Sequence, residues 1–451
     1  MAFRPKGPAQ RQAAQDMVPG LAVRLAAAAI LAEVAGKAQG LDERFAPGAG
    51  PQALQGLDPR DRALVRSIVL ASLRHLGSLR LAIAAMLEKG LPRKAQDLEW
   101  TLIVGAAQIL FMDVPDHAAV DLAVRATRHQ PRNAAFANLV NAVLRNIQRQ
   151  RDTWAHPADP FADTPQWLAA RWRKHYGEET AAAIALAHRH EPTLDLTLKS
   201  GIDQKSLPDG HLLPTGSWRL ASHAPIEDLP GYAQGDWWVQ DAAAAMPARL
   251  LQPKLGERIA DLCAAPGGKT AQLALSGAHV VALDRSAERL KRLTANLERL
   301  HLSAEIRVGD ALAFDAEPFD AILLDAPCSA TGTIRRHPDV AWTKKPSDVA
   351  ALAAVQAKML DRAVQLLKKN GRLLYCTCSL EPEEGEMQIE AFLRRHPEMR
   401  RLPIEAAEIG GLSACVTEQG DMRTLPSHLS QSDPRQAGLD GFFAARLAKG
   451  A

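Results

Sequence analysis

Cysteine is scarce in this chain, which has only five cysteines among 451 residues. An odd, widely spaced set cannot form the dense disulfide framework of a small secreted scaffold. No second cysteine pair and no cysteine–histidine cluster has the spacing of a zinc site, so we expect no bound metal. We therefore expect reduced thiols and a cytoplasmic protein.

Long apolar runs are also missing. No run is long enough to span a bilayer, so we expect no association with membranes. The one candidate for an export signal, residues 21–36, is interrupted by Arg24 and Glu33 at helical spacing, which favours an amphipathic helix. The hydrophobic share of 47% can still fill real cores. The composition predicts a soluble globular protein, which we expect to be monomeric.

A large excess of one charge is absent, since the formal net charge is +3. Its distribution is uneven: residues 1–160 hold 20 lysines and arginines against 14 acids, and the remainder holds 34 against 37. A basic surplus of this kind is often only a solvated face, but it also suits contacts with phosphates. The concentrated basic residues are Arg125, Arg128, Arg132, Arg145, Arg149 and Arg151. We expect this segment to bind nucleic acid.

Hydrophobic periodicity divides the chain into four parts. Residues 1–20 are rich in Gln, Ala, Pro and Arg and predict a flexible tail, whereas 21–150 repeat apolar residues at helical spacing and predict an all-α domain. Prolines then indicate a linker, which together with a small α+β module occupies 151–240. In 241–451 strands alternate with helices, which predicts a doubly wound α/β domain with mainly parallel strands.

The first strand of the α/β domain leads into "DLCAAPGGKT". Gly267 and Gly268 allow a ligand to approach the backbone, and the helix that follows favours a negative group at its N-terminus. A P-loop would need glycine where Cys263 stands, and no G-x-G-x-x-G is present, so neither a nucleotide triphosphatase nor a dinucleotide enzyme is expected.

Aspartates end four successive predicted strands, at Asp261, Asp284, Asp310 and Asp325. Ligands of such sheets bind at the carboxyl ends of the strands. Asp284 follows the glycine loop at about the ~20 residues typical of an acid that accepts from ribose hydroxyls. The series therefore indicates a cofactor that contains adenosine.

Two cysteines also stand at predicted strand ends. Cys328 lies in "DAPCS", and "LLYCTCSL" contains Cys376 and Cys378. We expect Cys378 to face a cleft and Cys376 to pack on the other face of the strand. The ordinary alternative is that such cysteines are small core hydrophobes.

Four segments together resemble the S-adenosylmethionine-dependent RNA cytosine-C5 methyltransferases. They are "DLCAAPGGKT", "LLDAPCSATGTIRRHPDVAW", "LLYCTCSLEPEEGE" and "GLDGFFAARL". The helical part, with "DRALVRSIVLASLRH" and "VPDHAAVDLAVRATR", resembles the NusB-like RNA-binding domain of the RsmB (Fmu/Sun) branch. The resemblance implies an enzyme that takes methyl groups from S-adenosylmethionine, with 16S rRNA or a ribosomal precursor as its RNA partner.

The resemblance also implies roles for individual residues. Asp284 would bind the ribose, Asp310 would lie near the adenine, and Asp325 would lie between the cofactor and the target base. The methionine part of the cofactor would be held by Cys263, Ala264, Ala265, Pro266, Gly267, Gly268 and Lys269.

Cytosine carbon 5 is a poor nucleophile, and covalent catalysis can activate it. A thiolate that adds to carbon 6 makes carbon 5 reactive towards a methyl donor. The resemblance assigns this addition to Cys378. We further predict that Cys328, at a neighbouring strand end, assists the release of the product, and that Asp325 shares a proton with ring nitrogen 3. Two alternatives stay open: an RNA-binding assembly factor with an inactive methyltransferase fold and, more weakly, a DNA cytosine methyltransferase, in which Cys328 would be the nucleophile.

Overall fold

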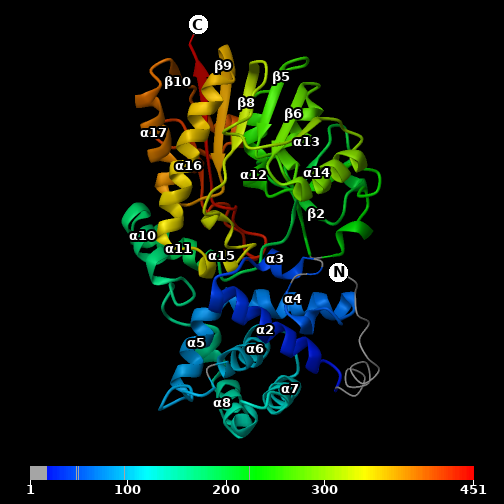
Figure 1. The fold of residues 1–451 in the computed structure, drawn as a ribbon, viewed down its shortest axis with the longest axis vertical. Helices are drawn as coiled ribbons and strands as arrows, with labels where there is room; N and C mark the ends of the chain where they lie inside the picture. Colours follow the sequence, from blue (N-terminus) through cyan, green and yellow to red (C-terminus); the bar gives the residue numbers. More distant parts are fainter. Residues whose placement is uncertain (1–17, 47, 49, 96, 223, 451) are drawn as a thin grey trace. The chain divides into compact units, whose positions relative to one another are not determined.

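The computed structural model describes residues 18–450 apart from 47, 49, 96 and 223, so most of the predicted tail lies outside the described residues. Its contacts form two compact units (Figure 1). The first holds residues 18–169 and 337–344, and the second holds 170–336 and 345–450. The domain limits that we infer from the sequence, near 20, 150 and 240, stay predictions.

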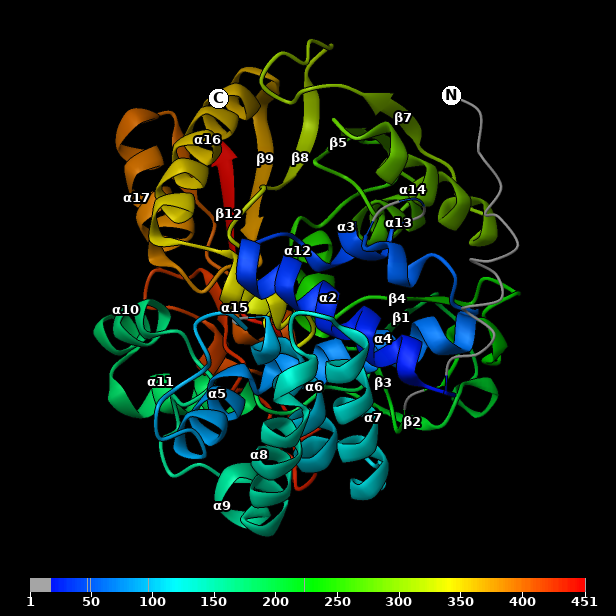
Figure 2. The same ribbon diagram turned by 60° about the horizontal axis from the view of Figure 1, so that its bottom comes forward.

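The first unit is all-α, and its helices surround one core of buried aliphatic side chains (Figure 2). Asp58 caps helix α4 (Pro59–Arg74) by accepting a hydrogen bond from the backbone N–H of Asp61, and Pro59 follows this cap at the first helical position. The helices are α2 (Leu21–Lys37), α3 (Leu41–Phe45), α4 (Pro59–Arg74), α5 (Leu76–Ala85), α6 (Leu98–Phe111), α7 (Asp116–His129), α8 (Ala137–Arg149), α9 (Arg151–Ala155) and α15 (Asp339–Thr343), with 3-10 turns at Gln52–Leu54 and Ala134–Phe136.

The prediction of an amphipathic helix at 21–36 is wrong in one respect. Helix α2 forms there, but it is buried along most of its length, because α4, α6 and α7 all pack against it. Its alanines let these neighbours approach closely. Arg24 is also buried, and its Nε and Nη2 donate to Oε1 of Gln108 at 2.9 and 2.7 Å. The charge that suggested a solvent face is thus satisfied inside the unit.

Helix α15 comes from the middle of a predicted methyltransferase motif but belongs to the helical unit. Trp342 packs against the helical core, and its Nε1 donates to the carbonyl of Leu73 at 2.8 Å. The backbone N–H of Leu41 donates to Asp339 at 3.2 Å. The motif "HPDVAW" therefore contributes to the fold of the helical unit.

The second unit contains a small antiparallel sheet in the order β2-β3-β1-β4. A buried ion pair crosses it, since Arg219 donates to both carboxylate oxygens of Asp195 at 2.7 and 2.9 Å. Its strands are β1 (Asp195–Leu198), β2 (Gly210–Leu212), β3 (Trp218–Leu220) and β4 (Trp237–Val239). Helix α10 (Gln166–Tyr176) begins just before the division between the units, and α11 (Glu178–Ala187) follows it. This confirms the predicted α+β module.

The large sheet has the order β10-β12-β9-β8-β5-β6-β7, with β11 paired to β12. The five strands from β9 to β7 are parallel, as predicted, but β12 runs antiparallel between β9 and β10. No crossover helix precedes β12, so the chain reaches it in the opposite direction. The strands are β5 (Arg258–Leu262), β6 (His279–Asp284), β7 (Glu305–Val308), β8 (Phe319–Asp325), β9 (Leu367–Thr377), β10 (Met399–Arg401), β11 (Met422–Thr424) and β12 (Phe442–Lys449).

Helices cover both faces of the large sheet (Figure 1). Helices α16 (Pro346–Gln365) and α17 (Glu386–Arg395) share a core with one face, whereas α12 (Ala242–Leu250) and α13 (Gly268–Leu275) pack on the other, next to α14 (Ala287–Arg299). This is the predicted doubly wound architecture.

Within the described residues, no single helix is long and apolar enough to cross a bilayer. Helices α4 and α5, which meet at 75°, pass that test only as a bent pair.

Candidate active site at the strand ends

The glycine loop joins β5 to α13. Gly267 has a φ of 104°, and a Cβ on it would lie 2.7 Å from Cγ of Leu293, so only glycine fits this turn. Asp284, at the end of β6, accepts from the backbone N–H of Ala265 at 3.1 Å and from that of Ser286 at 2.9 Å. The buried carboxylate thus ties the glycine loop to the next strand.

A cavity of about 320 Å³ opens beside this loop. Three of the predicted cofactor residues, Cys263, Asp284 and Asp310, line it. Val355 and Met359 of α16 add apolar surface to its wall. Burial raises the pKa of the Cys263 thiol to about 12, so this cysteine is an uncharged wall residue.

Asp325, at the end of β8, forms an ion pair that the sequence does not reveal. Its Oδ2 accepts from Nζ of Lys269 at 2.8 Å, and Lys269 also lies 5.0 Å from the centre of the Phe442 ring. Burial opposes the charge on Lys269, but the carboxylate of Asp325 outweighs it and raises the lysine pKa above its ordinary value. Cys376 is buried and donates to Oδ1 of Asp325 at 3.5 Å. The prediction that it packs on the face opposite Cys378 is wrong, because side chains two residues apart share a face of a strand and both cysteines pack in the same hydrophobic cluster.

The two predicted thiols meet, since Sγ of Cys328 lies 3.5 Å from Sγ of Cys378. Both side chains are half-buried. The hydrogen bond to Cys378, followed by burial, raises the pKa of Cys328 well above its ordinary value. The backbone also joins their loops, because Gly332 donates to the carbonyl of Cys378 at 3.0 Å and Gly441 donates to that of Gly332 at 2.8 Å.

Asp261, the first of the four predicted acids, lies under the loop rather than in the cavity wall. It is 1% exposed, and its Oδ2 accepts from Oγ1 of Thr270 at 2.6 Å. Burial raises its pKa to about 7. The hydrogen bond from Thr270 lowers the pKa, and the negative charge of Asp325 raises it further. Asp261 is therefore a structural residue next to the site.

Sequence reasoning missed two groups near these residues. Arg289 of α14 lines the cavity, donates to the carbonyl of Ala265 and lies 3.6 Å from Asp284. Glu384 is fully buried and accepts hydrogen bonds beside both thiols. Glu384 belongs to the motif "EPEEGE", but two of its partners, Ser329 and Gln356, are 55 and 28 residues away in the chain, so the sequence does not report these contacts.

The basic residues of the helical unit differ in their partners. Arg125 pairs with Asp121 at 2.7 Å, and Arg151 pairs with Asp116. Arg128, Arg132 and Arg149 are exposed, and Arg145 is half-buried. Among the described residues these four have no ion pair within 4.0 Å, so their charge is available for an anionic partner.

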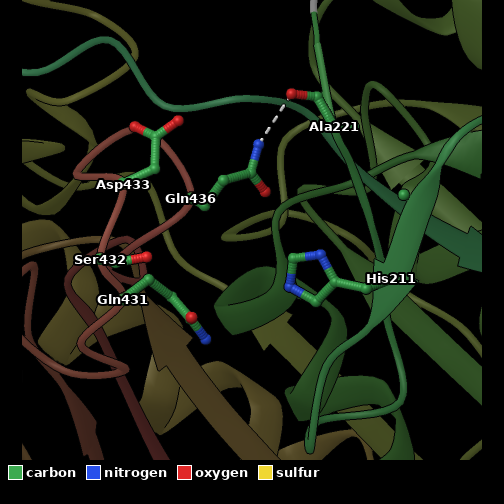
Figure 3. Close-up of a pocket in the computed structure, with 7 residues that line it drawn as sticks. His211, Ala221, Gln431, Ser432, Asp433 and Gln436 are labelled. Atoms are coloured by element: carbon green, nitrogen blue, oxygen red, sulfur yellow. Dashed lines mark hydrogen bonds between the residues drawn. The ribbon is translucent and has the colours of Figure 1, made fainter.

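A second hollow, of about 280 Å³, lies between β2 and the loop at 431–436 (Figure 3). Gln436 closes one side by donating to the carbonyl of Ala221 at 3.0 Å. None of the predicted site residues lines this hollow.

Comparison with known proteins identifies the family. The ribosomal RNA small subunit methyltransferase B of Vibrio cholerae is 36% identical over 448 residues, which cover 95% of this chain and 97% of that protein. The model of the 16S rRNA methyltransferase RsmB/F family matches residues 248–448, and that of the NusB family matches 21–149. This chain belongs to the RsmB/F family. As an RsmB/F protein it is an S-adenosylmethionine-dependent methyltransferase.

Solved structures share the RsmB/F fold. The crystal structure of PH0851 covers 96% of this chain and 99% of its own, with a TM-score of 0.71 and 23% identity. That of a methyltransferase homologue from Pyrococcus horikoshii covers 65% of this chain and 99% of its own, with a TM-score of 0.54 and 26% identity. The first likeness extends over both units.

Proposed function

We propose that this RsmB/F protein methylates carbon 5 of a cytosine in RNA, most simply in 16S rRNA, through a covalent bond between Cys378 and the base. The observation that carries the proposal is the pair of thiols 3.5 Å apart at neighbouring strand ends, next to the Lys269–Asp325 ion pair. The reaction begins with addition of the Cys378 sulfur to carbon 6 and ends with an elimination, in which a base such as water takes the proton from carbon 5 and the bond between carbon 6 and that sulfur breaks. The Cys328 thiol lies close enough to donate a proton to the departing sulfur.

The cavity supports the cofactor assignment. Its volume of about 320 Å³ lies within the range of about 300–1,000 Å³ for small-molecule pockets. We assign Asp284 to the ribose hydroxyls, Asp310 to the adenine side and the loop at 263–269 to the methionine part. Apolar contacts from α16 suit a flat aromatic ring. S-adenosylmethionine supplies the methyl group when it is bound.

We assign the nucleophile to Cys378 and the release step to Cys328. The raised pKa of Cys328 keeps a proton on its sulfur at neutral pH, so this thiol can donate to the sulfur of Cys378. Such a donor stabilises a neighbouring thiolate, which is the form that adds to carbon 6. We therefore propose Cys378 as the attacking group and Cys328 as its proton donor.

Asp325 is proposed to share with ring nitrogen 3 a proton that is taken up from solvent as negative charge develops on the ring. Lys269 holds one oxygen of this carboxylate at 2.8 Å and offsets its charge. Cys376 holds the other oxygen at 3.5 Å. The carboxylate is therefore fixed in orientation before the base arrives, which lowers the cost of reorganisation.

The helical unit is proposed to bind the RNA. Arg128 and Arg132 near the end of α7, with Arg145 and Arg149 of α8, offer charge that no described acid neutralises. Phosphate contacts of this kind provide affinity without sequence specificity. The monomeric state and cytoplasmic location stay predictions.

The assignment is tested by replacing each thiol in the full-length protein. Cys378→Ala should abolish methylation and form no covalent RNA adduct, whereas Cys328→Ala should accumulate an adduct that survives denaturing electrophoresis. Cys415→Ala is the control, because that thiol is buried elsewhere, against Nδ1 of His428.

Each alternative has its own outcome. An adduct trapped by Cys378→Ala would transfer the nucleophile to Cys328, as in the DNA enzymes. Absence of cofactor binding and of methylation in the unaltered protein would favour the assembly factor with an inactive fold.

A further inference from the structure

The segment "EPEEGE" begins three residues after Cys378 and carries four buried or half-buried carboxylates. Glu381 pairs with Arg171 of α10, and Glu386 pairs with Arg423 at 2.7 Å. Glu384, between them, has no cation within ion-pair distance among the described residues. Its side chain is instead surrounded by uncharged donors.

Those donors belong to the two cysteine loops. Glu384 accepts from the backbone N–H of Ser329 at 2.9 Å and from its hydroxyl at 2.5 Å. It also accepts from the hydroxyl of Ser379 at 2.5 Å and from the amide of Gln356 at 3.1 Å. Ser329 follows Cys328 and Ser379 follows Cys378, so one carboxylate cross-links the residues next to both thiols.

The backbone of Glu384 is anchored as well. Its carbonyl accepts from the hydroxyl of Tyr375 at 2.8 Å and from that of Thr377 at 3.1 Å. Both donors lie on β9, just before Cys378. The side chain is 0% exposed, so the cross-link is held against the core of the sheet and not against solvent.

We propose that Glu384 is a positioning residue that holds Cys328 within reach of Cys378, so that the covalent intermediate is released. This inference rests on the proposed function of the two thiols. A shift of about 1 Å in reacting groups can cost roughly 100-fold in rate, and without this carboxylate the two loops lose their shared acceptor.

The test compares variants of the full-length protein by the rate at which the covalent RNA adduct is released. Glu384→Ala should slow release by roughly 10- to 100-fold and leave the affinity for S-adenosylmethionine unchanged, because Glu384 does not line the cofactor cavity. Glu384→Gln, which keeps one acceptor oxygen, should restore part of the rate. Glu383→Gln is the matched control, since this carboxylate lies in the same turn but pairs with Arg171.

A second comparison separates positioning from general support of the fold. In a chain that already carries Cys328→Ala, Glu384→Ala should slow release no further, because the thiol that it positions is gone. Equal slowing in both backgrounds, or release at the unaltered rate in Glu384→Ala, would overturn the proposal.

Two further outcomes are separable. If Glu384→Ala fails to fold, as thermal unfolding would reveal, Glu384→Gln is taken through the same two backgrounds and decides the question. If Cys328→Ala traps no adduct at all, the proposed function of the thiols fails, whatever Glu384 does.

Discussion

Replacing Gly332 by alanine should separate the loops around Cys328 and Cys378, the two thiols to which we assign the chemistry. A Cβ at this position would lie 1.8 Å from the carbonyl oxygen of Gly441, which is backbone and cannot rotate away. Because carbon and oxygen atoms do not approach within about 3 Å, the two segments must move apart by more than about 1 Å. Gly332 is also the donor to the carbonyl of Cys378 at 3.0 Å.

The magnitude follows from these contacts. Overpacking a tight site costs about 1–3 kcal/mol. The two backbone hydrogen bonds at 2.8 and 3.0 Å would lengthen, at about 1 kcal/mol each. The terms overlap, so we expect a loss of about 2–4 kcal/mol in the free energy of unfolding of the second unit. For a unit of this size that lowers Tm by about 4–16 °C.

Activity should fall even where the variant remains folded. At a temperature where the variant is folded, displacement of the Cys378 loop should reduce methyl transfer by roughly 100-fold. Gly40→Ala is the control, since its nearest neighbours would be atoms of Glu43 at 3.7–3.9 Å and its φ of −61° suits alanine. A Gly332→Ala protein with unchanged Tm and unchanged methyl transfer would refute the reasoning.

Three other perturbations have defined outcomes. Asp284→Ala should weaken S-adenosylmethionine binding by about 1.5–3 kcal/mol in calorimetry, because a charged hydrogen-bond acceptor is lost. Unchanged affinity would contradict the assignment of Asp284 to the ribose. Asp315→Ala is the control, because the side chain of Asp315 is 94% exposed. Asp261→Asn should remove a pH dependence of stability. Because the folded pKa of Asp261 is about 7 against the ordinary 3.8, the unaltered protein should lose stability relative to the variant as pH rises from about 4 to about 7. A difference in unfolding free energy between the two proteins that is the same at pH 5 and at pH 8 would exclude this. Arg128→Glu with Arg132→Glu should weaken RNA binding and reduce its salt dependence by about one unit of slope per residue, whereas equal slopes would move the RNA contacts elsewhere.

The sequence alone determined most of the elements and the strand ends at which we propose the site. Apolar periodicity separates the helical part from the α/β part, because buried apolar residues recur every three or four positions in a helix and every second position in a strand. The glycine loop, Asp284 and the thiols of Cys328 and Cys378 could be predicted as site residues because strand ends and turn glycines leave local signatures. Periodicity failed at α2, where a charged residue is buried: Arg24 finds Gln108, 84 residues away, and no local pattern reports such a partner.

Only the tertiary structure decided which side chains meet. The two thiols are 50 residues apart, Lys269 and Asp325 are 56 apart, and Glu384 reaches Ser329 across 55. Each of these contacts depends on the order and register of β5, β8 and β9, which place distant residues side by side. A pattern read along the chain specifies the face and the end of a strand, but the distance between two strand ends is set by the packing of the whole sheet.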